Sequence, residues 1–259
     1  TMYAVLSPAK RLDLAPSALS QSTLPDLLGE SEKLVKKART LSKKQLGDLM
    51  KISETLAELN HERFQSWTQP FTAENSKPAA LSFAGDTYVG LDAGTLSEED
   101  LIWAQDRVGI LSGLYGLLRP LDRIQPYRLE MGTSLPTRRG KNLYAFWGDQ
   151  LTEAINERTS HHTDRSLINL ASKEYFTAVK PKGLASPVIT PTFKEIKKGQ
   201  AKVVGFMAKK ARGMMARFII EERLESPEAL KAFHAGGYCF QPDVSTESTW
   251  VFTRPSTTA

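Results

Sequence analysis

Cysteine is nearly absent from this sequence, and a long apolar run is missing altogether. The single cysteine, Cys239, excludes an internal disulfide bond and any metal site built from several cysteines. No apolar run reaches the ~20 residues that a membrane-spanning helix needs, and residues 1–10 lack the layout of a signal peptide. We therefore expect a cytoplasmic protein that does not enter a membrane.

Recognisable metal and nucleotide motifs are lacking as well. The four histidines have none of the paired spacings typical of zinc or iron sites, so we expect no stoichiometric metal. Residues 112–116 contain Gly113 and Gly116, but no lysine followed by serine or threonine comes after them. Nucleotide hydrolysis by a P-loop is therefore not expected, and the sequence indicates no cofactor.

The composition is that of an ordinary globular chain. Of 259 residues, 41% are hydrophobic and 24% are charged, which excludes wholesale disorder, a collagen helix and a coiled coil. Helical and strand patterns alternate irregularly, and no internal repeat or Gly/Ser/Pro linker divides the chain. We expect a mixed α/β (α+β) fold in which residues 1–259 form one compact domain, with helices flanking a mixed sheet. We also expect a monomer.

Residues 23–67 carry the periodicity of two or three amphipathic helices. Ser42 and Gln45 have the spacing of a capping box, which predicts a helix start at that point. A helix-hairpin-helix-like element here would present lysines to phosphates, although the glycine pair usual in such a hairpin is missing. An ordinary helix pair with lysines facing water stays open. The lysines in question are Lys43, Lys44 and Lys51.

Local patterns predict three further features. Residues 81–91 alternate as a β-hairpin with its turn at Gly85. Residues 188–196 and 201–208 have the character of two strands of a second hairpin. A long helix over residues 209–224 is expected to follow it.

Positive charge is concentrated in one part of the chain. Residues 173–217 contain nine Lys and two Arg against two Glu, a local balance of +9 in a chain whose net charge is +5. Such a segment on an otherwise slightly acidic protein is typical of a polyanion-binding surface. Within it, Lys209, Lys210 and Arg212 would stand at the start of the expected helix, where the helix dipole disfavours positive charge. A bound anion would relieve that cost.

Cationic groups also follow several of the expected strands. Lys10 comes after the first strand, Arg128 lies in a proline-fixed loop, and Ser172 begins a short helix after another strand. Loops beyond strand ends are where α/β proteins build binding clefts, so we expect these groups to converge with those of 209–217. Arg119 has the same kind of position. The result would be a positively charged cleft with two carboxylates, Glu130 and Glu174.

Six stretches of the sequence together resemble the YaaA peroxide-stress-resistance family of bacterial cytosolic proteins. The likeness runs from about residue 2 to residue 253, and its stretches are 7–10, 111–120, 126–132, 146–149, 169–175 and 209–217. The resemblance implies a response to hydrogen peroxide, limitation of free intracellular iron, and protection of DNA from Fenton damage. It also implies a single-domain fold with a positively charged cleft, a helix-hairpin-helix-like element, and binding to duplex or branched DNA.

The resemblance further implies which residues would bind DNA. These cleft positions are Lys10, Arg119, Arg128, Lys173, Lys180, Lys182, Lys209, Lys210, Arg212 and Arg217. The lysines of residues 23–67 named above would make secondary contacts. Because no base-reading helix is recognisable, we expect weak sequence preference, with phosphate neutralisation supplying the affinity.

An enzyme acting on a nucleotide or another anionic small molecule in the same cleft is the alternative, although we favour a binding protein. The groups that would carry such chemistry are Ser172, Glu174, Tyr175 and Glu130. A closed pocket of a few hundred cubic ångströms would favour the enzyme, and a long groove as wide as a duplex would favour DNA.

Overall fold

The centre of the molecule is a mixed sheet. We describe residues 2–256 in a computed structural model, in which the sheet has eight strands with β4-β3-β1-β6-β7-β10-β9 as the main order and β8 paired to β7. The five strands from β3 to β10 are parallel to their neighbours, whereas β4, β8 and β9 pair antiparallel. The expected mixed α/β fold in a single compact domain is therefore confirmed.

The strands are short except for one. Their bounds are β1 (Tyr3–Leu6), β2 (Lys77–Pro78), β3 (Val108–Ser112), β4 (Gly116–Leu118), β5 (Arg123–Ile124), β6 (Leu167–Leu170), β7 (Val188–Lys197), β8 (Gln200–Lys202), β9 (Cys239–Phe240) and β10 (Thr249–Pro255). Strands β2 and β5 form a separate pair. Strand β7 pairs with β6 through its first residues and with β10 through the rest, so it links two parts of the sheet.

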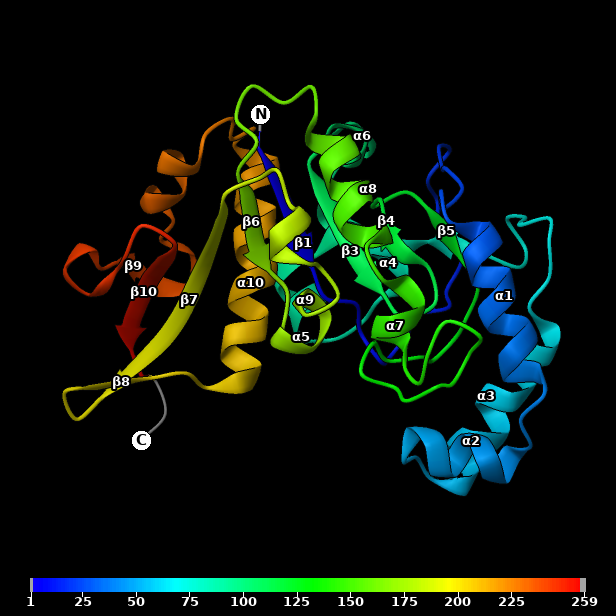
Figure 1. The fold of residues 1–259 in the computed structure, drawn as a ribbon. Coiled ribbons are helices and arrows are strands. Elements are labelled where there is room, and N and C mark those ends of the chain that lie inside the picture. Colours follow the sequence, from blue (N-terminus) through cyan, green and yellow to red (C-terminus); the bar gives the residue numbers. More distant parts are fainter. Residues whose placement is uncertain (1, 257–259) are drawn as a thin grey trace.

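Helices flank the sheet on both sides (Figure 1). Their bounds are α1 (Leu28–Arg39), α2 (Lys43–Met50), α3 (Glu54–Ser66), α4 (Ala79–Ser82), α5 (Asp86–Leu91), α6 (Glu98–Ala104), α7 (Leu143–Trp147), α8 (Gln150–Thr159), α9 (Lys173–Phe176) and α10 (Gly205–Glu221). Helices α1, α2 and α3 lie at one end of the molecule, and β7 to β10 lie at the other (Figure 1). Within residues 2–256, no helix has both the length and the apolar character needed to cross a membrane.

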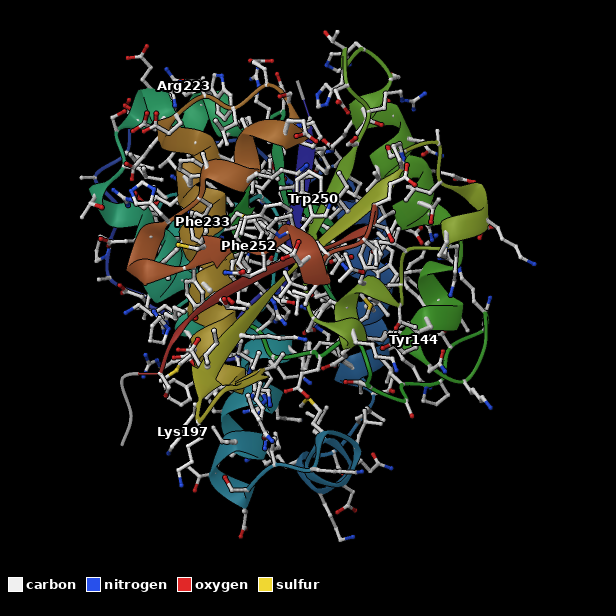
Figure 2. The ribbon with its side chains drawn as sticks, turned by 90° about the vertical axis from the view of Figure 1, so that its left-hand side faces the viewer. Tyr144, Lys197, Arg223, Phe233, Trp250 and Phe252 are labelled. Carbon is white, nitrogen blue, oxygen red and sulfur yellow. The ribbon has the colours of Figure 1, made fainter. Side chains whose placement is uncertain are left out.

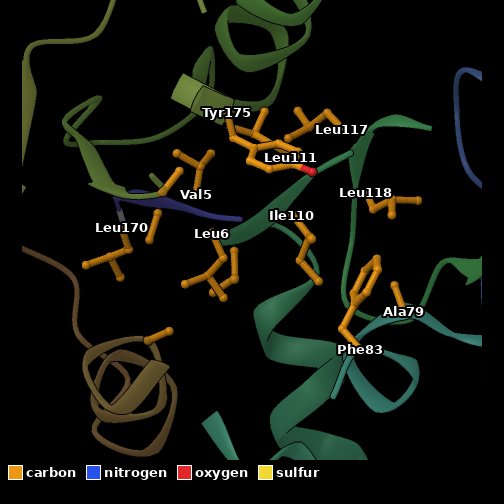
Figure 3. Close-up of a cluster of buried hydrophobic side chains, with 14 of the residues drawn as sticks. Val5, Leu6, Ala79, Phe83, Ile110, Leu111, Leu117, Leu118, Leu170 and Tyr175 are labelled. Carbon is orange, nitrogen blue, oxygen red and sulfur yellow. The ribbon is translucent and has the colours of Figure 1, made fainter. Parts of the chain in front are cut away.

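The hydrophobic core is built around apolar strands at the centre of the sheet. All residues of β1 and β3 are buried, as expected for parallel strands covered on both faces. Figure 3 shows their side chains packed with Phe83 and Ala79 on one side of the strands and with Tyr175 of α9 on the other. A second aromatic cluster holds β7 and β10 together, in which the rings of Phe193 and Phe252 stack with 5.5 Å between centroids. Phe233, Trp250 and Phe252 mark this region in Figure 2.

Of the two or three helices expected in residues 23–67, the structure has three, α1, α2 and α3. Ser42 caps α2 through a complete capping box with Gln45, as the sequence predicts. The chain between α2 and α3 turns through Lys51, which adopts a left-handed conformation with φ of 54°. Whether this pair works as a helix-hairpin-helix-like element stays a prediction.

The prediction of a β-hairpin over residues 81–91 is wrong. These residues form the end of α4 and all of α5, and Gly85 precedes the first turn of α5 instead of forming a β-turn. Contact with α10 explains the difference, because a Cβ added at Gly90 would lie 2.0 Å from the main-chain oxygen of Lys210. A Cβ at Gly213 of α10 would likewise lie 1.7 Å from the oxygen of Thr87. Two glycines thus allow α5 and α10 to touch backbone to backbone, and this distant contact favours a helix.

The second hairpin is shorter than expected, and the long helix begins earlier. Strand β8 ends at Lys202, and α10 begins at Gly205 and ends at Glu221. Lys209, Lys210 and Arg212 therefore follow the first helical turn and do not stand at its start. Since the effect of the helix dipole falls off within the first turn, the dipole argument made for these cations does not hold. Any anion site here has to be argued from the side chains themselves.

Candidate functional site

A pocket lies beyond the carboxyl ends of β1 and β6. The loop after each strand contributes to its wall, together with residues 84–87, residues 127–130 and the outer face of α10. Its volume is about 690 Å³, which is within the range of small-ligand sites, and it is open on one side. We refer to it as the β1–β6 pocket.

Positive side chains outnumber negative ones around this pocket by six to three. The cationic lining residues are Lys10, Arg11, Arg128, Lys173, Lys209 and Arg212. The acidic ones are Asp86, Glu130 and Glu174. Five of the expected DNA-binding residues therefore come together from four distant segments of the chain. Without a ligand, mutual repulsion among these cations is only partly offset by the acids.

Two serines join the loops that follow β1 and β6. The Ser7 hydroxyl donates to Ser172 Oγ across 3.3 Å and accepts a hydrogen bond of 2.8 Å from the Ser172 main-chain N–H. The Tyr88 hydroxyl donates to the main-chain oxygen of Ser7 across 2.7 Å, which adds α5 to the same junction. These bonds fix the floor of the pocket and leave the hydroxyl hydrogen of Ser172 available to a ligand.

Glu130 lies between two cations. Its Oε1 is 3.1 Å from Lys10 Nζ and 3.6 Å from Arg128 Nη2. These two ion pairs do not meet the hydrogen-bonding needs of the side chains. Glu130 Oε1 and Arg128 Nε are both buried, and neither has a hydrogen-bond partner of good geometry in residues 2–256. Lys10 is held loosely, since 68% of its side chain is exposed. Burial without a partner is costly, and a ligand with donors and negative charge would remove that cost.

Glu174 has a different role from Glu130. Its Oε2 accepts a 2.9 Å hydrogen bond from the Gly132 main-chain N–H, and its main-chain oxygen accepts one of 2.6 Å from the Tyr144 hydroxyl. The first bond ties α9 to the loop that contains Gly132, and the second ties it to α7. The carboxylate is therefore occupied in holding residues 126–132 in place.

Arg212 is the most conspicuous group in the pocket. Its side chain is partly buried on the face of α10 turned toward the pocket, and in residues 2–256 it has no ion pair, hydrogen bond or ring contact. Burial alone lowers the pKa of this guanidinium, because no carboxylate stands close enough to counter it. An unpaired arginine in this position is suited to bind an anionic group with two parallel hydrogen bonds.

Neutral tyrosines form part of the wall. Tyr127 and Tyr175 are 6% and 9% exposed, and burial raises the pKa of both phenols well above 10. The Tyr127 hydroxyl is paired with Ser112 Oγ at 2.6 Å. The small exposed part of each residue therefore forms a neutral part of the wall beside the cations.

Two of the expected cleft residues lie outside the lining of this pocket and hold the fold together. Arg119 pairs with the buried carboxylate of Asp122 at 2.9 Å and with Asp26 at 3.3 Å. Arg217 pairs with Glu221 and donates to the main-chain oxygens of Leu91 and Asp92 at 3.0 and 2.8 Å, where α5 ends. Asp122 and Glu221 lie three and four residues from their arginines, whereas Asp26 and the main-chain oxygens at the end of α5 are far away in the sequence. Only these distant contacts, which tie each arginine to another part of the fold, could not be seen in the sequence.

The remaining expected contacts are outside the pocket lining as well. Lys180 lies 6.0 Å above the Tyr144 ring, Lys182 is exposed on the following turn, and Lys210 is exposed on α10 beside Lys209. On α2, Lys43 pairs with Glu58 at 3.2 Å, Lys44 pairs with Asp48 at 3.3 Å, and Lys51 is exposed.

Lysines at the two ends of the molecule differ in their pairing. On α1 and α2, Lys33, Lys36, Lys43 and Lys44 each form an ion pair with a nearby acid, and Lys37 is the lysine of these helices for which the described residues provide none. On the β7–β8 hairpin and the adjoining part of α10, the described residues provide no ion pair for Lys194, Lys197, Lys198, Lys202, Lys209 or Lys210. Lys197 marks the end of this hairpin in Figure 2. Uncompensated positive charge therefore extends from the β1–β6 pocket toward the hairpin.

Two charged residues of the pocket lining are not among those that the sequence predicts for the site. Arg11 follows Lys10 and donates from Nε to the main-chain oxygen of Ala84 at 2.9 Å, and Asp86 opens α5. Arg11 could have been included as the neighbour of Lys10. Asp86 could not have been included, because the sequence pattern predicted a hairpin turn next to it, at Gly85.

The four groups of the enzymatic alternative all line the pocket, but they do not form a nucleophile–base pair. Ser172 has a serine as its hydroxyl partner, Glu174 is bonded to the main chain, and burial keeps the Tyr175 phenol protonated. Nucleophilic catalysis needs a hydroxyl within reach of a base. In residues 2–256, no cluster of three or more His, Cys, Asp or Glu side chains is arranged to hold a metal ion.

Comparison with known proteins gives one consistent match. The profile of the peroxide stress protein YaaA family matches residues 2–244. A UPF0246 protein of Magnetococcus marinus is 58% identical over 255 residues, which cover 98% of this chain and 99% of that protein. UPF0246 proteins of Ralstonia pickettii and Cellvibrio japonicus are 53% and 52% identical, and the alignments cover at least 98% of each chain.

Proposed function

This chain belongs to the peroxide stress protein YaaA family, and from that membership and the site we propose that it binds DNA during the response to hydrogen peroxide. In this proposal the β1–β6 pocket and the cations beside it contact the phosphate backbone. Binding shields DNA from damage, and the protein limits free intracellular iron.

The observation that carries the proposal is the unpaired Arg212 in a pocket with six cations and three acids. A guanidinium that loses hydration without gaining a partner is unfavourable, and a phosphate would supply both charge and hydrogen-bond acceptors. The unpaired lysines of the β7–β8 hairpin and α10 support a polymeric anion over a small one, because a single small molecule in the pocket would leave them uncompensated. A repeating chain of phosphates would reach both regions.

Binding of this kind draws mainly on phosphate neutralisation, so it should depend weakly on base sequence and strongly on salt. Fluorescence anisotropy with several unrelated duplexes tests this. We expect dissociation constants that agree within about tenfold at one salt concentration and rise steeply with salt. Absence of binding to every duplex at low salt would overturn the proposal.

The proposed role in peroxide stress has its own test. In cells that lack the protein, peroxide should cause more DNA breaks and raise chelatable iron, and the wild-type chain should reverse both effects. A pocket variant, Arg212→Ala with Lys209→Ala, should fail to prevent the breaks. Full protection by that variant, at equal protein levels, would separate protection from DNA binding by the pocket.

An enzyme acting on a nucleotide or another anionic small molecule is the second candidate. The size of the pocket favours it, since about 690 Å³ suits a small ligand and does not amount to a groove as wide as a duplex. Calorimetric titration with free nucleoside monophosphates tests this alternative. Saturable binding at micromolar concentration, together with turnover of the bound nucleotide, would favour the enzyme over the DNA-binding protein.

A further inference from the structure

We propose that the β1–β6 pocket receives a single unpaired nucleotide of the bound DNA, with Glu130 accepting a hydrogen bond from the amino group of its base. This inference rests on the proposed function and adds to it the unit of DNA that enters the protein. It reconciles a surface charge pattern that suits a polymer with a pocket that suits a small ligand.

The first argument is size. A cube of 690 Å³ has an edge of about 9 Å, which is smaller than the thickness of a duplex, whose two backbones lie on either side of a full base pair. Paired DNA can therefore lie across the mouth of the pocket but cannot enter it. One nucleotide turned out of the helix can enter, as happens in proteins that extrude a base into a closely fitting site.

The second argument is the presence of Glu130. A site that served only to neutralise phosphate would gain nothing from a carboxylate, because it repels phosphate and competes for the nearby cations. Glu130 nevertheless points its Oε1 into this group of cations, where it lies 3.1 Å from Lys10 Nζ and accepts no well-formed hydrogen bond in residues 2–256. The exposed Lys10 can move to a phosphate and leave that oxygen to the base. Carboxylates accept hydrogen bonds from exocyclic amino groups of bases in this way.

The third argument is the neutral wall. Tyr127 and Tyr175 line the pocket, and burial raises the pKa of both phenols, so the small part of each that is exposed, 6% and 9%, gives the pocket a neutral aromatic area beside the cations. Proteins that bind unpaired nucleotides combine such aromatic surface with nearby positive charge. Arg128 and Arg212 would hold the phosphates on either side of the base, since both guanidinium groups line the pocket and lack complete sets of partners.

Extrusion of a paired base costs unstacking and unpairing, and this cost is smallest where the base is already unpaired. The protein should therefore bind a duplex with one unpaired adenine more tightly than the same duplex fully paired. A duplex with an unpaired abasic unit has a similarly interrupted backbone without a base. It therefore separates recognition of the base from recognition of a flexible backbone.

The test is fluorescence anisotropy with these three duplexes at one salt concentration. We expect at least about tenfold tighter binding of the adenine bulge than of the abasic bulge. Glu130→Leu should bring this ratio close to one, and Glu130→Gln, which keeps an acceptor oxygen, should retain most of it. The matched control is Glu58→Leu on α3, which removes the same charge from an exposed site and should leave the ratio unchanged.

The outcomes separate this inference from the proposed function. Tight binding of all three duplexes with equal affinity would overturn the single-nucleotide inference and leave DNA binding intact. Equal effects of Glu130→Leu and Glu58→Leu on the ratio would also overturn it, because Glu130 would then act only through its charge. No binding of any duplex at low salt would overturn the proposed function itself.

Discussion

Replacing Lys209, Lys210 and Arg212 by alanine is the perturbation with the most definite consequence for DNA binding. All three side chains are on α10, none has an acidic partner in residues 2–256, and two of them line the β1–β6 pocket. If each contacts one phosphate, the slope of log K against log salt should become shallower by about 0.9 per contact, or about 2.7 in all. When salt is raised from 50 to 200 mM, the factor by which affinity falls should therefore be about 40 times smaller for the variant than for the wild type.

Anisotropy titrations at four or more salt concentrations give both slopes. The matched control is alanine at Lys33, Lys36 and Lys37 on α1, where an equal charge is removed far from the pocket lining. Its slope should stay close to that of the wild type. Alanine favours helix at all six positions, so neither variant should unfold, and circular dichroism checks this. Equal changes of slope in both variants would refute the reasoning, because diffuse charge and not a site would then bind the DNA.

Three further predictions concern the fold and metal content. Gly213→Ala should destabilise the protein by roughly 1–3 kcal/mol or more in denaturant unfolding, because its Cβ would lie 1.7 Å from the Thr87 oxygen. Gly29→Ala on α1, where nothing lies within 4 Å of the added Cβ, should be neutral or stabilising by about 0.5 kcal/mol, and the opposite order would contradict the packing described. A hydrogen bond from Arg139 lowers the pKa of the Glu30 carboxyl from 4.5 to about 2, so this ion pair stabilises the fold above pH 4.5 and is lost as the pH falls toward 2. Arg139→Ala should flatten the dependence of Tm on pH in that window, and an unchanged profile would contradict the assignment. Elemental analysis of the dialysed protein should find no stoichiometric iron or zinc, and one iron per chain would show that the effect on iron is direct.

Local rules predicted much of the fold because the relevant contacts are local. Ser42 with Gln45 forms the capping box at the start of α2 that the sequence predicts. The buried strands could be read from their apolar runs. The helix in residues 81–91 could not be predicted from such a local pattern, since it depends on contact between Gly90 and the backbone of α10, more than a hundred residues away.

The candidate site shows the same difference between features that depend on local sequence and features that depend on distant contacts. Lys10 and Ser172 were expected to lie together because each follows a strand, and Arg128 was added because it lies in a proline-fixed loop. The structure brings all three to one pocket, with Lys10 and Ser172 beyond β1 and β6 and Arg128 in the loop after β5. Arg119 and Arg217 were grouped with them for their charge and for the resemblance to the YaaA family, and Arg119 also for its position after a strand. Asp122 and Glu221 lie three and four residues from these arginines. The other partners, Asp26 and the main-chain oxygens at the end of α5, come from distant parts of the chain, and no sequence pattern indicates those contacts.

Lysine acylation footprinting, read by mass spectrometry with and without a duplex, tests the central claim most directly. The account predicts that DNA protects Lys10, Lys173 and Lys209 of the β1–β6 pocket, together with the lysines of the β7–β8 hairpin. Lys33 and Lys36 on α1 should react equally in both samples. Unchanged reactivity of the three pocket lysines under conditions in which the duplex is bound would contradict the account.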